Sequence, residues 1–433
     1  MSRLSFGFER PIPRCFRARQ RFLRPRTERL EEAIASELRK VVPAGRVRPG
    51  ARIGVTVGSR GIRDLPRIVR AAVRFLEARD VRPFIIPAMG SHGGATAEAQ
   101  RRLIAHLGVT EASIGAPIDD SMDTRRLGKT REGVDVFVAD SALRADGVLL
   151  INRVKPHTDF KGEIESGLAK MCAIGLGKLE GARECHAHAF GLGLGPAILA
   201  AARAIVSTGK ILGGLAVVEN AYHETALVEG VPAESLFDAE RRLLAEARKL
   251  LGRLPLGELD VLVCDRMGKN ISGTGLDTNV IGRSVHGFVE GVPWQPGMPI
   301  VWRIVVRSLT PESEGNAVGL GLVDFATEEF RRAIDLRVTL LNALTATAPA
   351  NARLPAILPS DREAILAALA TAPRREGGPI LACARDTLEL EDVLLSEASM
   401  ELVSGMDGIE ILSDPEPLRF DEEGRFLPPW GAS

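Results

Sequence analysis

Residues 53–62 read IGVTVGSRGI, a short run rich in β-branched residues that ends in a glycine-containing turn. A stretch with a helical period follows from Asp64 to about Arg79, and a second apolar run, PFIIPA, occupies residues 83–88. A short strand, a helix and another short strand in this order form the βαβ unit of parallel sheets. The stretch therefore predicts an α/β fold with a mostly parallel sheet.

The same alternation continues toward the C-terminus. Further strands are expected at 133–139, 147–152 and 211–218, and further helices at 195–207 and 234–251. Beyond these elements the chain repeats the pattern, with strands expected at 259–264, 299–307 and 318–323, and helices near 325–332 and 361–371.

Pro255-Leu256-Gly257 interrupts this alternation, so we place a domain boundary near residue 257. The sequence thus predicts two α/β domains, residues 1–257 and 258–433, with the active site in the cleft between them. The polar tail at the C-terminus could return to the first domain. The arginine-rich N-terminal segment is expected to pack along the first domain through Phe6, Phe8, Ile12 and Phe16.

The composition excludes several classes of protein. Lys and Arg together number 56, as do Asp and Glu, so no overall field attracts nucleic acid or an anionic membrane. The five cysteines are scattered and never form a CxxC pair, which argues for a reducing compartment and against a structural zinc site. The sequence has no apolar run of the roughly 18 residues that span a bilayer. We therefore expect a cytoplasmic protein.

The first candidate site is the turn Gly90-Ser91-His92-Gly93-Gly94-Ala95-Thr96, between an expected strand and an expected helix. Glycines let a backbone approach a ligand, and the amides of a helix N-terminus favour a phosphate or carboxylate. An ordinary turn capped by Ser91 or Thr96, with His92 exposed, accounts for these residues equally well. As a ligand site, the turn would place His92 where open α/β sheets bind their ligands.

Two more strand ends carry polar groups. Arg60 follows the strand at 53–57 and suits bidentate recognition of a carboxylate, although in a chain with 47 arginines a solvent-exposed role is also plausible. His157 follows the strand at 147–152, in a segment where residues 155–178 hold four of the nine lysines. The carboxyl ends of parallel strands share one edge of a sheet, so these loops are expected to converge. His92 and His157 could then take and return a proton near neutral pH.

Two further stretches offer polar groups. Glu184-Cys185-His186-Ala187-His188 contains two imidazoles, but residues at i and i+2 do not share a helix face, so we expect at most one of them to bind a metal. A surface or capping role is the alternative. The glycine-rich stretch 268–283 places Lys269 and Asn270 where they could contact an anionic ligand, or it forms a hinge loop.

Taken in order, Arg60, the Gly90-Ser91-His92 turn with Thr96, Pro156-His157, Lys170 and His186 resemble the nickel-dependent lactate racemase family. The resemblance covers roughly residues 50–280. It implies a racemase or epimerase of a 2-hydroxyacid that carries a nickel pincer nucleotide, Ni(II) pyridinium-3,5-bisthiocarboxylic acid mononucleotide. In that family two sulfurs and a ring carbon of the cofactor bind the nickel, and one histidine completes the ligand set.

The resemblance also implies the roles of single residues. His92 and His157 match the acid/base pair, Arg60 matches the substrate-orienting arginine, and His186 matches the nickel ligand. Lys170 matches the lysine that is joined to the cofactor. The cofactor phosphate would bind the turn through Ser91, Gly93, Gly94 and Thr96.

Several alternatives stay open at this point. The spacing from His157 to Lys170 is slightly longer than in the family, so Lys161 could be the attachment point, or the cofactor could be held without a covalent bond. The chain could instead be a metal-dependent lyase or hydrolase that uses Glu163 or Glu165, or a non-catalytic nucleotide-binding protein. A small 2-hydroxyacid is the expected substrate, and proteins that synthesise the cofactor are possible partners.

Overall fold

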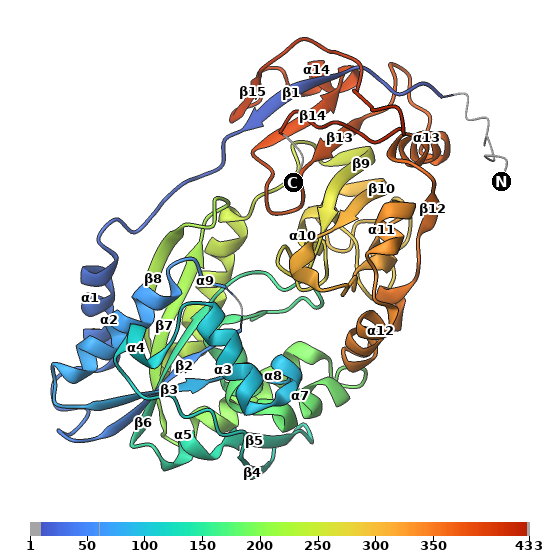
Figure 1. Cartoon of the computed structure of the whole chain (residues 1–433). Coiled ribbons are helices and arrows are strands. Elements are labelled where there is room, and N and C mark those ends of the chain that lie inside the picture. The colour runs from blue at the N-terminus through green and yellow to red at the C-terminus, as the bar shows by residue number, and fades with distance from the viewer. Residues whose placement is uncertain (1–9, 60, 431–433) are drawn as a thin grey trace. The chain divides into compact units, whose positions relative to one another are not determined.

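The computed structural model describes residues 10–59 and 61–430 and divides into two compact units (Figure 1). One unit is Leu23–Leu251, and the other combines Met1–Phe22 with Gly252–Ser433. The second break in the chain lies shortly before the turn at 255–257 that the sequence singled out. No helix within residues 10–59 and 61–430 is long and apolar enough to cross a membrane.

The unit Leu23–Leu251 is built on a five-stranded sheet in the order β3-β2-β6-β7-β8. The first four strands in this order run parallel and the last is antiparallel. Their bounds are β2 (Arg52–Val57), β3 (Arg82–Pro87), β6 (Gly147–Arg153), β7 (Ile211–Glu219) and β8 (Thr225–Pro232). The predicted α/β class, with a mostly parallel sheet, is therefore confirmed.

Both faces of this sheet are buried, as a parallel sheet requires. Side chains alternate across a strand, so Val148 and Leu150 of β6 enter one apolar cluster while Leu149 and Ile151 enter the other. One cluster takes side chains from α1 and α2, and the other takes them from α8 and α9 (Figure 1). Each face thus has its own core.

The helices of this unit account for most of the long periodic stretches in its sequence. They are α1 (Leu30–Val41), α2 (Leu65–Glu77), α3 (Ala97–His106), α4 (Glu111–Ile114), α5 (Asp140–Arg144), α6 (Gly167–Lys170), α7 (Lys178–Ala187), α8 (Leu194–Val206) and α9 (Leu236–Leu250). The expected strand at 133–139 is present as β5 (Asp135–Ala139). It pairs only with β4 (Thr124–Lys129) in a separate hairpin.

The other unit contains an eight-stranded mixed sheet in the order β12-β11-β10-β9-β13-β14-β1-β15. Its strands are β1 (Cys15–Gln20), β9 (Glu258–Met267), β10 (Ile300–Leu309), β11 (Phe325–Thr327), β12 (Ala356–Leu358), β13 (Leu381–Ala384), β14 (Asp392–Ser396) and β15 (Ile409–Ile411). Its helices are α10 (Thr278–Ile281), α11 (Glu328–Arg332), α12 (Leu336–Thr345), α13 (Asp361–Thr371) and α14 (Met400–Val403).

The structure corrects our prediction for the N-terminal segment. Its residues do not pack along the Leu23–Leu251 unit, because β1 forms antiparallel ladders with β14 and β15 of the other unit. Phe16 and Ala18 are fully buried in that unit's core, and Phe6 and Phe8 lie outside the described residues. The C-terminal tail packs in the same unit, where Trp430 donates its indole N–H to Asp265.

The expected strand at 318–323 is also wrong. Leu320–Leu322 form a short 3-10 turn, and the neighbouring strand is β11 at Phe325–Thr327. Gly319 has a φ of 112°, which breaks the extended backbone just before the turn. Leu320 and Leu322 are nevertheless fully buried, so the apolar run was a correct signal of burial and a wrong signal of strand.

Candidate active site

Three loops with polar residues leave one edge of the sheet in the Leu23–Leu251 unit. They follow β3, β2 and β6, which are adjacent in the sheet and run parallel. The first loop carries His92, the second carries Ser59 and the third carries His157. The predicted convergence of these strand ends is therefore present in the fold.

The Gly90–Thr96 loop has an unusual backbone. Gly90, Gly93 and Gly94 have φ values of 62°, 65° and 62°, and Ala95, which is not a glycine, has 57°. The left-handed region disfavours side chains, so the glycines are needed for this loop to form. Thr96 caps α3, because its hydroxyl accepts a hydrogen bond from the N–H of Ala99 at 3.3 Å.

A buried amide holds this loop from below. Gln100 has no exposed surface, and its Nε2 donates to the carbonyls of Gly90 at 3.0 Å and His92 at 3.2 Å. His92 itself is exposed, and its Nδ1 contacts the hydroxyl of Ser59. The loop is thus fixed on both sides of an exposed imidazole. Arg60, the next residue after Ser59, lies outside the described residues.

His157 and Lys170 form the closest polar contact among the candidate residues. The His157 Nε2 lies 2.5 Å from the Lys170 Nζ. The backbone N–H of Asp159 donates to the other ring nitrogen, Nδ1, at 3.1 Å. The Phe160 ring packs against the imidazole with centroids 4.5 Å apart, and the Lys170 Nζ is 5.9 Å from the centre of that ring. The histidine is therefore oriented from three sides.

Glu165 organises the loop that carries His157. Its carboxylate is buried and accepts the backbone N–H of His157 at 2.7 Å and that of Gly162 at 3.2 Å. It also pairs with Arg248 at 2.6 Å and with Lys161 at 3.3 Å. Lys161 in turn donates to the His157 carbonyl at 2.6 Å. Glu165 and Lys161 are thus occupied in holding the loop.

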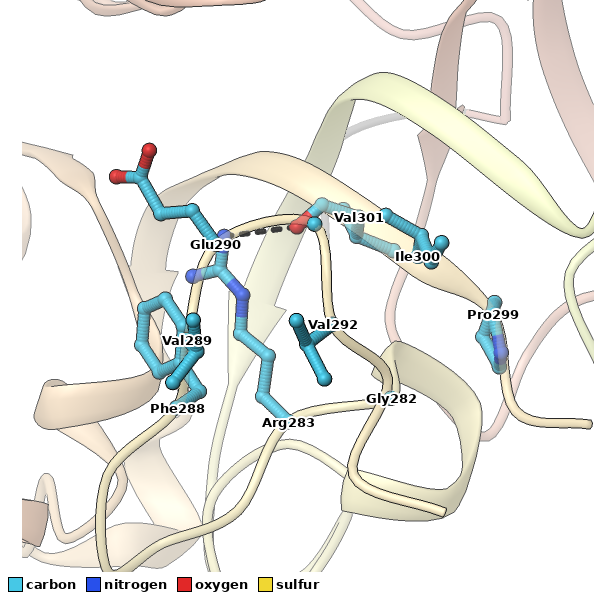
Figure 2. Close-up of a pocket in the computed structure, with 10 residues that line it drawn as sticks. Gly282, Arg283, Phe288, Val289, Glu290, Val292, Pro299, Ile300 and Val301 are labelled. Carbon is cyan, nitrogen blue, oxygen red and sulfur yellow. Dashed lines mark hydrogen bonds between the residues drawn. The ribbon is translucent and has the colours of Figure 1, made fainter. Parts of the chain in front are cut away.

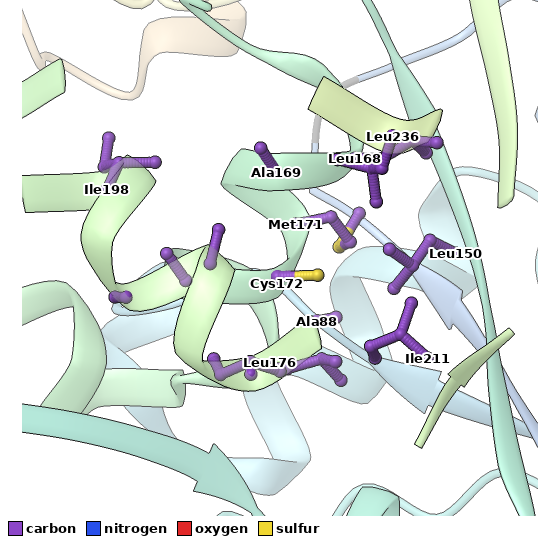
Figure 3. Close-up of a cluster of buried hydrophobic side chains, with 14 of the residues drawn as sticks. Ala88, Leu150, Leu168, Ala169, Met171, Cys172, Leu176, Ile198, Ile211 and Leu236 are labelled. Carbon is purple, nitrogen blue, oxygen red and sulfur yellow. The ribbon is translucent and has the colours of Figure 1, made fainter. Parts of the chain in front are cut away.

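Lys170 lies at the end of α6, which continues directly into a π-helical segment, Met171–Leu176. Figure 3 shows Leu168, Met171 and Cys172 packed against Leu150 of the sheet. These side chains are nearly or fully buried, whereas Lys170 is only partly buried. The amine is therefore mounted on a rigid apolar base, and π-helical turns are frequent at functional sites.

A second buried acid supports α6. Glu240 of α9 accepts the backbone N–H of Ala169 at 3.0 Å and that of Leu168, so it caps the helix from outside. Gly167 is required there, since an added Cβ would lie 2.0 Å from the Glu240 Oε1. Burial raises the pKa of Glu240 to about 8, against the opposing effect of the two backbone hydrogen bonds. No sequence signal pointed to this residue.

The raised pKa of Glu240 predicts a pH-dependent stability. Between its ordinary value of 4.5 and about 8 the carboxyl stays protonated in the folded state but ionises in the unfolded state. The unfolded state then binds fewer protons, so the free energy of unfolding falls as the pH rises through this window. We expect urea unfolding at pH 5 and pH 8 to show a loss on the order of 3 kcal/mol in the wild type that Glu240→Gln lacks. Glu246→Gln, on the exposed side of the same helix, should keep the wild-type pH dependence.

His186 lies in the last turn of α7 and is partly buried. Burial lowers its pKa, the charge of Asp159 opposes this, and the charge of Lys170 adds to it. His186 is therefore close to the His157–Lys170 pair and favours the neutral form that binds metals. His188 instead turns back to the Glu184 carbonyl at 3.0 Å. As expected for i and i+2 positions, the two imidazoles have separate environments.

Lys178, the last of the four clustered lysines, has a structural contact. It is fully buried, has a φ of 53°, and donates to the Pro87 carbonyl at 2.7 Å. Burial lowers its pKa to about 8, although Asp119 and Asp120 act against the shift. The residue thus ties the start of α7 to the end of β3.

Lys269 and Asn270, which the sequence suggested for substrate binding, belong to the other unit. The Lys269 Nζ donates to the Gly273 carbonyl at 2.6 Å and to the Asn342 side chain at 2.8 Å, and the Thr310 hydroxyl donates to Asn270 at 2.7 Å. These contacts shape the glycine-rich loop.

A small pocket of the same unit surrounds the buried Arg283 (Figure 2). The guanidinium donates to the carbonyls of Val301 and Leu322 at 2.9 and 2.6 Å and pairs with Asp324 at 2.8 Å. The Phe288 ring stacks on it at 4.1 Å. These contacts give Arg283 a structural role and point to no chemistry at this pocket.

Comparison with known proteins supports the resemblance seen in the sequence. Residues 30–191 match the family model described as the lactate racemase N-terminal domain. A solved structure, the lactate racemase apoprotein from Thermoanaerobacterium thermosaccharolyticum, aligns over 79% of this chain and 83% of that chain, with 14% sequence identity and a TM-score of 0.45. A comparison with curated proteins gave no match. The matched segment includes His92, His157, Lys170 and His186, and by this match the chain belongs to the lactate racemase family through its residues 30–191.

Proposed function

We propose that the protein is a racemase or epimerase that inverts the C2 centre of a 2-hydroxyacid by reversible hydride transfer to a nickel pincer nucleotide. The lactate racemase N-terminal domain supports an isomerase. The finer assignment is supported above all by one observation, the 2.5 Å contact between His157 Nε2 and Lys170 Nζ beside His186. A proton-transfer group, an amine and a metal-binding imidazole lie together there.

The residues present fit this cofactor. Within residues 10–59 and 61–430, no three His, Cys, Asp or Glu side chains form a set that could hold a metal ion by themselves. The pincer nucleotide of the family brings three donors of its own and needs one more, which the partly buried and neutral His186 can supply. Lys170 would be the attachment point, since Lys161 is held by Glu165 and the His157 carbonyl.

The cofactor, when bound, would supply an acceptor for the hydride that leaves C2. The side chains of the chain would handle the proton and the orientation of the substrate. His92 and His157 would hold and release the hydroxyl proton at their Nε2 atoms, because Ser59 and the Asp159 N–H occupy the two Nδ1 atoms. Arg60 would hold the carboxylate, and Lys269 and Asn270 stay predicted substrate contacts.

The structure offers little support for a lyase or hydrolase that uses Glu163 or Glu165. Glu165 is buried under four donors, and no substrate proton can reach it without breaking them. Glu163 is 67% exposed and pairs with Arg241 on the surface. Neither carboxylate is placed to act as a general base.

Purification from a host that makes the cofactor tests the proposal. We expect about one nickel per chain, a mass increment on the peptide that contains Lys170, and interconversion of the enantiomers of at least one member of a panel of 2-hydroxyacids. Chiral chromatography would follow the reaction, and protein from a host without the cofactor is the control. Equal racemisation by that control protein would reject the proposal.

A further inference from the structure

The His157–Lys170 pair is mounted on two separate backbone segments. His157 lies in the loop after β6, and Lys170 lies 13 residues later at the end of α6. A contact of 2.5 Å between them is sensitive to any movement of either segment. Something outside both segments must therefore fix their spacing.

One helix, α9, reaches both segments. Near its start Glu240 caps α6 through the N–H groups of Leu168 and Ala169. Near its end Arg248 pairs with Glu165, which holds the N–H of His157. Residues 240 and 248 are eight positions apart, about 12 Å along the axis and within a quarter turn of each other. The two supports thus act from one rigid element.

Both supporting carboxyls are costly to bury. Glu165 and Glu240 are 1% and 0% exposed. Burying a carboxylate costs several kcal/mol unless donors compensate it, and apolar residues would fill the same space without that cost. The acids do not reach substrate, so their backbone contacts on either side of the pair are the function that their placement supports.

The state of Lys170 follows from the same geometry. A backbone N–H can only donate, so the His157 Nδ1 accepts from Asp159 and the proton of the neutral ring lies on Nε2. That proton faces the Lys170 amine, which must then accept it and carry no extra proton. The other titratable groups near the amine are Asp159, Cys185 and His186. An unprotonated amine is the nucleophilic form of lysine.

From these contacts we propose that Glu165, Arg248 and Glu240 are positioning residues through which α9 holds His157 against Lys170 and keeps the lysine a reactive amine. The proposal rests on the proposed function for its biological meaning, because attachment of a cofactor needs such an amine. Its physical content concerns the protein without cofactor and is tested there.

The experiment measures how fast Lys170 is acylated in the cofactor-free protein. A succinimidyl ester at limiting concentration and pH 7.5 labels the amines, and peptide mass spectrometry compares Lys170 with the exposed Lys249 as an internal reference. Arg248→Met and Glu165→Gln should lower the ratio at least about fivefold, because a released lysine regains its proton. Arg248→Lys, which can still donate to Glu165, should restore most of it.

Two further variants make the result specific. Arg241→Met removes an exposed ion pair between α9 and the same loop, at Glu163, and should leave the ratio unchanged. His157→Phe should lower the ratio as much as Arg248→Met does, and the double variant should show no additional loss, because Arg248 acts through His157.

An Arg248→Met ratio equal to that of Arg241→Met, or an additional loss in the double variant, overturns the proposal. If Arg248→Met fails to fold, Glu165→Gln and His157→Phe decide by the same criteria. Racemisation is not part of this measurement. A protein that labels as expected but never racemises would leave this inference standing and reject the proposed function.

Discussion

Lys170→Arg is expected to abolish attachment of the cofactor and to lower racemisation by about 10³-fold or more. Arginine keeps a positive charge, but its guanidinium is not a nucleophile and always donates hydrogen bonds. The proton on the His157 Nε2 would then face another donor at a site where Lys170 now lies 2.5 Å away. Both the covalent bond and the local hydrogen bond are lost by this one change.

Lys161→Arg is the matched control for this prediction. Lys161 lies four residues after His157 and pairs with the buried Glu165, a contact that arginine can also make. We expect this variant to keep the mass increment and most of the nickel, measured by intact-protein mass spectrometry and elemental analysis. The opposite pattern, with the increment lost from Lys161→Arg and kept in Lys170→Arg, would move the attachment point to Lys161.

The sequence predicts those parts of the site that follow from the strand order. A strand followed by a glycine turn or a polar loop indicates a ligand edge, and this pattern alone places His92 and His157 at strand ends on one edge of the sheet, where the fold has them. Likewise, β2, α2, β3 and α9 appear close to where the hydrophobic period places them.

The supports of the site could not be predicted in the same way. Glu240 lies 70 residues after Lys170 in an ordinary amphipathic helix, and nothing in its neighbours distinguishes it from the exposed Glu246. Gln100 follows the glycine turn by a few residues and looks like a solvent-facing helix residue, yet it is buried. Such contacts depend on how helices pack on the sheet, which periodicity does not specify.

The position of β1 shows the same limit at the level of the fold. An arginine-rich segment with spaced apolar residues is compatible with packing along any neighbouring surface. Its partners, β14 and β15, are more than 370 residues away in sequence, as the Arg19–Asp392 ladder pair shows. Local pattern carries no record of such a distant antiparallel ladder.

His92→Asn is expected to lower racemisation by about 10²- to 10⁴-fold, the usual range for a general acid or base, while the nickel content and the mass increment on Lys170 stay at their wild-type levels. Asparagine keeps a polar side chain that can meet Ser59, but it neither takes up nor releases a proton near neutral pH. His92 is exposed on a loop held by Gln100, so the change should not disturb the fold. Loss of activity with a fully loaded cofactor separates a proton-transfer role from a cofactor-holding role.

His106→Asn supplies the comparison, since His106 is an exposed histidine of α3, the helix that follows the same loop. We expect it to racemise like the wild type in the chiral assay. Ser59→Ala should fall between the two, by about threefold to tenfold, because it removes the hydroxyl that fixes the His92 ring but leaves the imidazole in place. Nickel-loaded His92→Asn protein that still racemises at the rate of His106→Asn would show that His92 transfers no proton, and the acid/base pair would then have to be sought elsewhere on this edge of the sheet.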